Sequence, residues 1–321
     1  MTNHDETAEL TTVGGVPTLR FERRFAHPPQ RVWQAITDPV QLQAWFPAAV
    51  QTELRAGAPM RFTFGFGEQP EADGPWEGEV LEVDPPKVFM FRWNRDVLRF
   101  ELIAQDTGCL LVFTHALGHG KIGRLGAART AAGWDGCLIA LAAALDGTRA
   151  EGAQDDWLQR AEGYAEKFEL AGGWAEPGSE GEVRLRFTRD LVPQHAEGAW
   201  EVLVEDSVPR IGDAAPVRAG NPVVEPGPVT AIEPARLLEY EVTVDAVPAG
   251  RVRWELIADP DTGTRLELTH ALPAGSGAEQ ARLLAVWQVQ LELFYAANRG
   301  VIRCPWPQQR VTELTARYAA S

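Results

Sequence analysis

The sequence predicts an α+β fold of two tandem domains, each a curved antiparallel sheet wrapped on a long carboxy-terminal helix, with two short helices. Three observations predict it: an internal repeat, a run of short strand-like segments in each copy, and a closing segment with helical periodicity. The chain has 321 residues, of which 45% are hydrophobic. That is enough apolar material for two buried cores.

The repeat is clearest in one long stretch. Residues 98–117, LRFELIAQDTGCLLVFTHAL, return as residues 252–272, VRWELIADPDTGTRLELTHAL, with one residue inserted in the turn. A period of about 150 residues is too long for a solenoid unit and matches a duplicated domain. We therefore expect a first domain at 1–170 (core 19–147, closing segment to 170), a linker at 171–182, and a second, degenerate domain at 183–321.

The first copy opens with a strand and two short helices. Residues 19–25 alternate between apolar and polar side chains, which predicts a strand. Residues 31–37 place Val32, Trp33 and Ile36 on one helical face. A second helix is expected over residues 40–46, with Asp38 as its cap and a proline in its first turn.

Five strand-like stretches separated by Gly, Pro, Asp and Asn follow these helices, and a long helix closes the copy. The stretches are residues 59–66, 76–83, 88–93, 97–104 and 109–117. Consecutive short strands of this kind are typical of an antiparallel sheet. Residues 127–145 then carry apolar side chains at helical spacing. In the second copy, the Gly/Pro-rich residues 219–228 shorten or replace the first hairpin.

Alternation along the strands places a histidine of each copy inside. Leu266, Leu268 and Leu272 share one strand face with His270, and the same register places His115 beside Phe113. A buried histidine usually has its ring nitrogens satisfied by hydrogen bonds, so a structural role is the default. Its presence in both copies does not distinguish a structural from a functional role.

Charge and cysteine usage exclude several function classes. The formal charge of −15 argues against nucleic acid and anionic membranes as partners. Three widely spaced cysteines predict neither a disulfide framework nor a cysteine zinc site, and they favour a reducing cytoplasm. The amino terminus is polar and acidic, unlike a signal peptide, and no apolar run is long enough to span a bilayer. We expect no metal and no cofactor.

The first copy resembles the SRPBCC (START/Bet v 1-like) superfamily, and within it the family named after the activator of the heat-shock protein 90 ATPase. The resemblance rests on FERRF at 21–25, PQRVWQAITDP at 29–39, WFP at 45–47, FRW at 91–93 and Gly133-Trp134. It covers nearly all of residues 19–147. It implies a helix-grip fold whose sheet and long helix enclose a cavity. The second copy lacks the WFP motif, which puts its own pocket in doubt.

The resemblance, together with the largely apolar interior, leads us to expect a binding protein that holds or sequesters a hydrophobic or aromatic small molecule, mainly in the first domain. His115, together with Arg129 or Asp135, is expected to supply polar groups at the mouth of the pocket. The aromatic candidates are equally the expected core of a domain of this size. The candidate ligand-binding residues are Trp45, Phe46, Phe64, Phe66, Trp76, Phe91, Trp93, Phe100, Phe113, His115, Trp134, Leu138, Leu141, Trp254, His270 and Trp287.

Two alternatives remain open at this point. The first is an enzyme on the same scaffold, resembling a polyketide cyclase/aromatase or a hydrolase, with His115 as general acid or base. No nucleophile elbow, zinc-protease motif or phosphate loop occurs, so catalysis is not the favoured interpretation. The second is a co-chaperone-like interaction module with a role in stress response, which the family name implies. We also expect a monomer whose two copies face each other as an intrachain pseudo-dimer.

Overall fold

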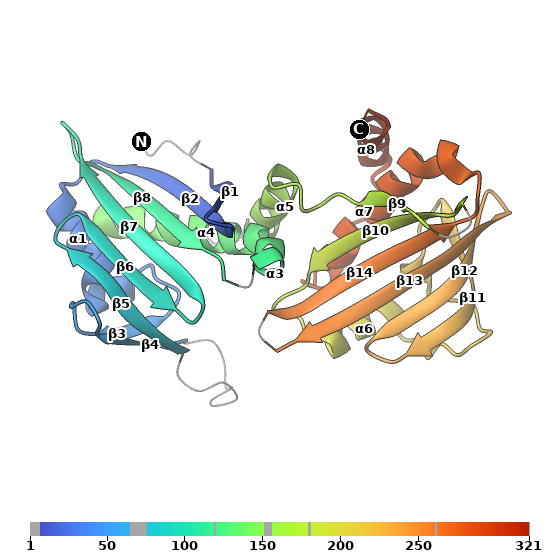
Figure 1. Cartoon of the computed structure of the whole chain (residues 1–321), viewed down its shortest axis with the longest axis horizontal. Helices are drawn as coiled ribbons and strands as arrows, with labels where there is room; N and C mark the ends of the chain where they lie inside the picture. The colour runs from blue at the N-terminus through green and yellow to red at the C-terminus, as the bar shows by residue number, and fades with distance from the viewer. Residues whose placement is uncertain are drawn as a thin grey trace. The chain divides into compact units, whose positions relative to one another are not determined.

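The computed structural model describes residues 7–64, 76–118, 120–150, 156–178, 181–260 and 262–320. The chain divides into two compact units, Met1–Phe168 and Glu169–Ser321. Each unit combines one antiparallel sheet with helices (Figure 1). The predicted α+β fold with two helix-grip domains is therefore confirmed.

The first unit contains an eight-stranded sheet in the order β1-β2-β8-β7-β6-β5-β4-β3. Its strands are β1 (Glu9–Val13), β2 (Val16–Phe25), β3 (Ala49–Thr52), β4 (Pro59–Thr63), β5 (Trp76–Asp84), β6 (Val88–Trp93), β7 (Asp96–Ala104) and β8 (Cys109–Ala116). Its helices are α1 (Pro29–Thr37), α2 (Pro39–Leu42), α3 (Gly120–Leu125), α4 (Ala127–Leu145) and α5 (Trp157–Lys167).

The long helix α4 lies behind this sheet in Figure 1. Its buried face includes Trp134, Leu138 and Leu141, as the helical spacing predicts. On β8, Phe113 and His115 are buried whereas Val112 and Thr114 are partly exposed. The alternation along the strand therefore directs the predicted side chains toward the interior.

Helix α2 is shorter than the sequence predicts, because it ends at Leu42 rather than at Phe46. Beyond it the chain continues as hydrogen-bonded turns, in which the amides of Trp45 and Phe46 donate to the carbonyl of Leu42. The indole N–H of Trp45 also donates to the carbonyl of Ala35 at 2.9 Å. These bonds direct both aromatic rings into the unit in place of a longer helix.

Asp38 caps α2, as the sequence predicts. Its carboxylate accepts hydrogen bonds from the amides of Val40 at 2.8 Å and Gln41 at 3.1 Å. We expect Asp38→Ala to lower the free energy of unfolding of the first unit by about 1 kcal/mol, because it leaves these amides without their acceptor. Urea denaturation measures the loss. Asp38→Ser, which keeps a capping oxygen, is the control, and an equal loss in both variants would contradict the capping role.

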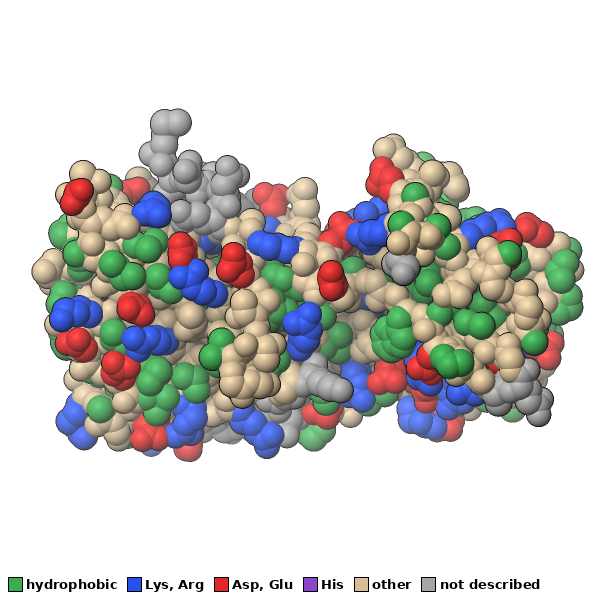
Figure 2. All heavy atoms as spheres, turned by 45° about the horizontal axis from the view of Figure 1, so that its top comes forward, with side chains coloured by type: hydrophobic (Ala, Val, Ile, Leu, Met, Phe, Trp, Pro, Cys, Tyr) green, Lys and Arg blue, Asp and Glu red, His purple; other side chains and the backbone are tan. Residues whose placement is uncertain are grey.

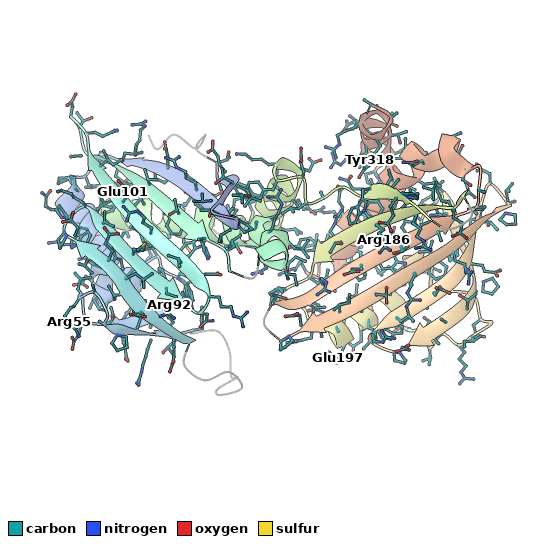
Figure 3. The ribbon with its side chains drawn as sticks, in the orientation of Figure 1. Arg55, Arg92, Glu101, Arg186, Glu197 and Tyr318 are labelled. Atoms are coloured by element: carbon teal, nitrogen blue, oxygen red, sulfur yellow. The ribbon has the colours of Figure 1, made fainter. Side chains whose placement is uncertain are left out.

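The outer faces of the two sheets carry ordered pairs of opposite charge. On the first sheet Arg92 pairs with Glu79, and Arg99 pairs with Glu82 at 2.7 Å. Arg92 on β6 lies on the face turned away from α4 (Figure 3). Figure 2 shows acidic and basic side chains mixed over the viewed face of each unit, not gathered into patches of one sign. This arrangement is typical of a solvated surface.

The second unit contains a six-stranded sheet in the order β11-β12-β13-β14-β10-β9. Its strands are β9 (Trp174–Pro177), β10 (Val183–Asp190), β11 (Val224–Glu233), β12 (Leu237–Val244), β13 (Val247–Asp259) and β14 (Gly263–Leu272). Its helices are α6 (Ala196–Val204), α7 (Gln280–Ala297) and α8 (Gln308–Ala319), with short 3-10 helices η2 (Val217–Ala219) and η3 (Ser276–Glu279).

The segment predicted as a linker, residues 171–182, differs from that expectation because it carries β9. Strand β9 pairs with β10 as β1 pairs with β2. Its short, Gly- and Pro-containing sequence resembles a boundary, but backbone pairing with the neighbouring strand orders it. The second unit therefore begins earlier than the sequence repeat suggests.

Each unit joins its first segment to its last helix through a tyrosine. The amide of Ala8 donates to the hydroxyl of Tyr164 on α5 at 2.9 Å, and the amide of Gly173 donates to that of Tyr318 on α8 at 2.8 Å (Figure 3). The duplication therefore extends to segments whose sequence similarity is weak. None of the helices in the described part of the chain combines the length and apolar character needed to cross a bilayer.

Candidate functional site

The first unit contains an apolar cavity beneath α1 and α2. Its volume is about 210 Å³, including the space at its mouth. Most of this volume lies at the open mouth or in gaps narrower than a water molecule, so the enclosed part has room for about one water molecule. The lining residues are Ile36, Leu42, Trp45, Phe46, Val50, Met60, Phe89, Phe91 and Phe100.

Four of the predicted ligand-binding residues line this cavity: Trp45, Phe46, Phe91 and Phe100. The others have different positions. Phe113, His115, Trp134, Leu138 and Leu141 are buried in the first unit, and Trp254, His270 and Trp287 are buried in the second. Phe64 is 38% exposed and stacks on Trp93, with ring centroids 5.7 Å apart. Phe66 lies outside the described residues, and Trp76 is described only as the first position of β5.

Aromatic rings fill the interior between the cavity and α4. Phe46 lies at the centre of this cluster, with ring centroids 5.7 Å from both Trp93 and Trp134 and 6.4 Å from Phe91. Phe100 stacks on Phe113 at 4.4 Å. This ring packing separates the cavity from the long helix. The lining comes from α1, from α2 and the turn after it, and from strands β3, β4, β6 and β7.

The list of candidate residues omitted five lining residues: Ile36, Leu42, Val50, Met60 and Phe89. The alternation in β4 could have identified one of them, because Met60 and Phe62 are buried whereas Arg61 and Thr63 are exposed. The helical periodicity of residues 31–37 also places Ile36 on an apolar face. No sequence signal, however, tells whether an inward side chain borders a cavity or a fully packed region.

His115 has both ring nitrogens in hydrogen bonds. The indole N–H of Trp134 donates to Nδ1 at 2.8 Å, and Nε2 lies 2.8 Å from the carboxylate of Asp96. The other oxygen of Asp96 accepts from the amide of Gly118 at 2.7 Å. These partners assign the proton to Nε2, because Nδ1 must accept. A general base needs a nitrogen that reaches substrate, so this geometry favours the structural role of His115.

The second unit repeats the indole–imidazole pair with another outer partner. Trp287 donates to Nδ1 of His270 at 3.0 Å, and Nε2 of His270 donates to the carbonyl of Ala249 at 2.9 Å. Burial lowers the pKa of His270 to about 4. Gly250 occupies the position equivalent to Asp96, and a Cβ there would lie 1.9 Å from the carbonyl oxygen of Ala271. The backbone therefore leaves no room for a carboxylate at this position.

Asp135 is not at the mouth of the cavity. It is 8% exposed and accepts hydrogen bonds from Arg23 on β2 and from the hydroxyl of Tyr164 on α5. Burial raises the pKa of Asp135, although its contacts with Tyr164 and Arg23 act in the opposite direction. These three side chains connect the sheet to helices α4 and α5. They form a buried polar network away from the cavity lining.

The residues that the structure describes contain no candidate metal-binding site. Within them, no three His, Cys, Asp or Glu side chains are placed to hold one ion. The cavity lining contains no titratable group. What the arrangement can offer chemically is apolar contact and exclusion of water.

Residues 26–146 match the model of a protein family described as "Activator of Hsp90 ATPase homolog 1-like protein". The first unit is therefore similar to this family over most of its length. The match lies within the predicted core, residues 19–147, and includes every residue that lines the cavity. No curated protein matches the chain.

Several solved structures are similar to this chain. One is a conserved protein of unknown function, EF2215 from Enterococcus faecalis, with 22% identity, 50% coverage of this chain, 90% coverage of that chain and a TM-score of 0.43. CalU16 from Micromonospora echinospora has 21% identity, with 52% and 98% coverage and a TM-score of 0.40. DynU16, described as a putative protein in the dynemicin biosynthetic locus, has 18% identity, with 88% and 99% coverage and a TM-score of 0.39.

Proposed function

We propose that the first unit binds a small apolar molecule, such as a compound with a single aromatic ring, in the cavity beneath α1 and α2. The observation that carries this proposal is the lining, which consists of nine apolar side chains. Affinity in such a site comes from removing apolar surface from water, at about 25 cal/mol per Å². The absence of charge in the lining disfavours ionic ligands, whose desolvation would go uncompensated.

The size of the cavity limits the ligand. Pockets for drug-sized molecules usually enclose about 300–1,000 Å³, whereas the enclosed space here holds only about one water molecule. A single-ring ligand would still have to displace lining side chains. Met60 is suited to such movement because its unbranched side chain adapts to irregular shapes.

Toluene is a suitable probe for this site. At a concentration about 100 times its Kd, a ligand specific for the folded state should stabilise the first unit by about 2.7 kcal/mol. We expect Val50→Phe to abolish this stabilisation, because the larger ring occupies the cavity. Thermal unfolding with and without toluene measures the difference.

Val40→Phe is the matched control for this experiment. Val40 is 76% exposed on α2, whereas Val50 is 5% exposed in the lining, so the same substitution is made outside and inside the cavity. The control should keep the full toluene effect. Equal stabilisation of both variants by toluene, or none in the native chain across a series of single-ring compounds, would overturn the proposed function.

A further inference from the structure

A short segment closes the interior of the second unit. We call residues 216–220, which contain η2, the plug. Ala219 in the plug is fully buried, whereas its neighbour Val217 is 86% exposed. The first unit fills the corresponding part of its interior with the rings that follow α2. The second unit uses a small side chain and the main chain of the plug.

Two buried donors hold the main chain of the plug. The hydroxyl of Tyr240 donates to the carbonyl of Ala219, and the side-chain amide of Gln290 donates to the carbonyl of Arg218 at 2.6 Å. The hydroxyl of Tyr240 also accepts from the indole N–H of Trp254 at 2.9 Å. Its proton is therefore directed at the plug, and burial raises the pKa of Tyr240 so that the proton is retained.

The repeat shows which residues of the first unit correspond to the two donors. Both of those residues are weak hydrogen-bonding groups. Tyr240 pairs with Val252 as Phe91 pairs with Leu98, so Tyr240 is the counterpart of Phe91 in the cavity lining. Gln290 follows Trp287 by three residues, as Cys137 follows Trp134. The second unit therefore has two convergent donors: Tyr240 at the position of a cavity-lining residue of the first unit, and Gln290 at a position on the long helix outside that lining.

The plug combines buried and exposed residues: Pro216, Ala219 and Gly220 are buried, and Ala219 is part of the hydrophobic core, whereas Val217 is exposed. Besides the two carbonyls, Arg218 forms an ion pair with Glu205 whose side chains are 27% and 48% exposed. Partly exposed pairs of this kind contribute little to stability. Two further apolar side chains beside the plug, Val208 and Ile211, are 80% and 70% exposed.

We propose that the plug is a displaceable internal occupant of a second binding site, which takes a neutral apolar molecule with two carbonyl oxygens close together, such as a 1,3-diketone. In the open state Tyr240 and Gln290 donate to the ligand oxygens instead of to the carbonyls of the plug. The ligand is neutral because the plug carries Arg218 away with it, leaving only uncharged donors in a buried site. This site is independent of the cavity in the first unit.

A closed plug reduces the apparent affinity by the fraction of molecules that are open. Loosening the plug must therefore increase affinity without adding any contact to the ligand. Gly220→Ala suits this purpose, because a Cβ there would lie 2.6 Å from Cδ of Pro226 and 3.1 Å from the carbonyl oxygen of Val224. The added methyl group moves the plug and leaves both donors in place.

The test combines hydrogen exchange with titration of dibenzoylmethane, a neutral 1,3-diketone. We expect Gly220→Ala to speed exchange of the plug amides at least tenfold while β13 and β14 keep their protection. The variant should bind dibenzoylmethane at least tenfold more tightly than the native chain, with new protection in the second unit. Adding Tyr240→Phe to Gly220→Ala should remove that gain.

Tyr318→Phe in the Gly220→Ala background is the control, because it also deletes one hydrogen-bonded tyrosine hydroxyl of the second unit, here a partly buried one, but leaves the plug contacts intact. It should keep the gain. Arg218→Ala, which removes only the ion pair with Glu205, replaces Gly220→Ala if that variant does not fold. The proposal is overturned if plug amides exchange only together with β13 and β14, if the Tyr240 and Tyr318 variants bind alike, or if dibenzoylmethane protects only the first unit.

Discussion

Asp135→Asn should destabilise the first unit by about 3–5 kcal/mol, the usual cost of removing one partner from a buried ion pair. The side chains of Arg23 and Asp135 are only 17% and 11% exposed. The substitution leaves the guanidinium of Arg23 without its buried counter-charge and weakens the hydrogen bond of Tyr164. Hydrogen exchange of the β8 amides at pH 7 measures the loss in the first unit alone.

A double variant separates charge from packing. Arg23→Met with Asp135→Leu replaces the ion pair by apolar side chains, and such replacements are often neutral or stabilising. We therefore expect it to recover most of the loss.

In the second unit the equivalent Arg189 donates to the carbonyls of Leu170 and Ala171, and Gln288 stands in place of Asp135. Gln288→Leu removes its hydrogen bonds with Tyr318 at 2.7 Å and Glu292 at 3.0 Å but no charge of its own, so it should cost less than Asp135→Asn, about 2 kcal/mol. A comparable loss in Gln288→Leu and Asp135→Asn would contradict this account.

Acid should destabilise the second unit through His270. Its pKa is about 4 in the folded state, against 6.5 without the influence of the fold. The neutral ring is therefore favoured by folding, and this contribution is fully present above pH 6.5 and is lost as the pH falls from 6.5 toward 4. At 1.36 kcal/mol per pKa unit, the loss is about 3 kcal/mol.

Hydrogen exchange of the β14 amides between pH 7 and pH 4, corrected for the intrinsic exchange rate, measures this loss. His270→Gln should flatten the pH dependence, because the amide keeps an acceptor for Trp287 and a donor for Ala249 but does not titrate in this range. His195→Gln, at an exposed position before α6, is the control and should retain the native pH dependence. If His270→Gln lost as much stability in acid as the native chain, another group would be responsible.

Prediction from the sequence was accurate where local backbone geometry decides the outcome. Alternation placed His115 and His270 inside, and helical spacing placed Trp134 and Trp287 on the buried faces of α4 and α7. Both patterns depend only on the repeat of the backbone. The cytoplasmic location, the monomeric state and the facing arrangement of the two copies stay predictions.

The candidate site was predicted less completely, for a reason that Phe46 illustrates. The sequence marks it as an aromatic residue in a family motif, yet its contacts with Phe62, Phe91 and Trp134 join a turn, two strands and a helix. The size of a cavity is the small difference between the volume enclosed by these elements and the volume of their side chains. No local sequence pattern encodes that difference in volume. The sequence therefore predicted lining residues such as Trp45, but it did not predict that the cavity lies away from α4.

The sequence by itself determined that the chain is a duplicated α+β fold, because the repeat and the strand and helix periodicities are properties of neighbouring residues. Only the tertiary structure decided what each interior polar group bonds. The two histidines have the same neighbours in sequence, but His115 meets a carboxylate and His270 meets a main-chain carbonyl. The physical reason is that hydrogen-bond partners are set by distances between strands and helices far apart in the chain. At a single position, the residue is Asp96 in the first unit and Gly250 in the second. This difference decides which group Nε2 of the histidine can reach.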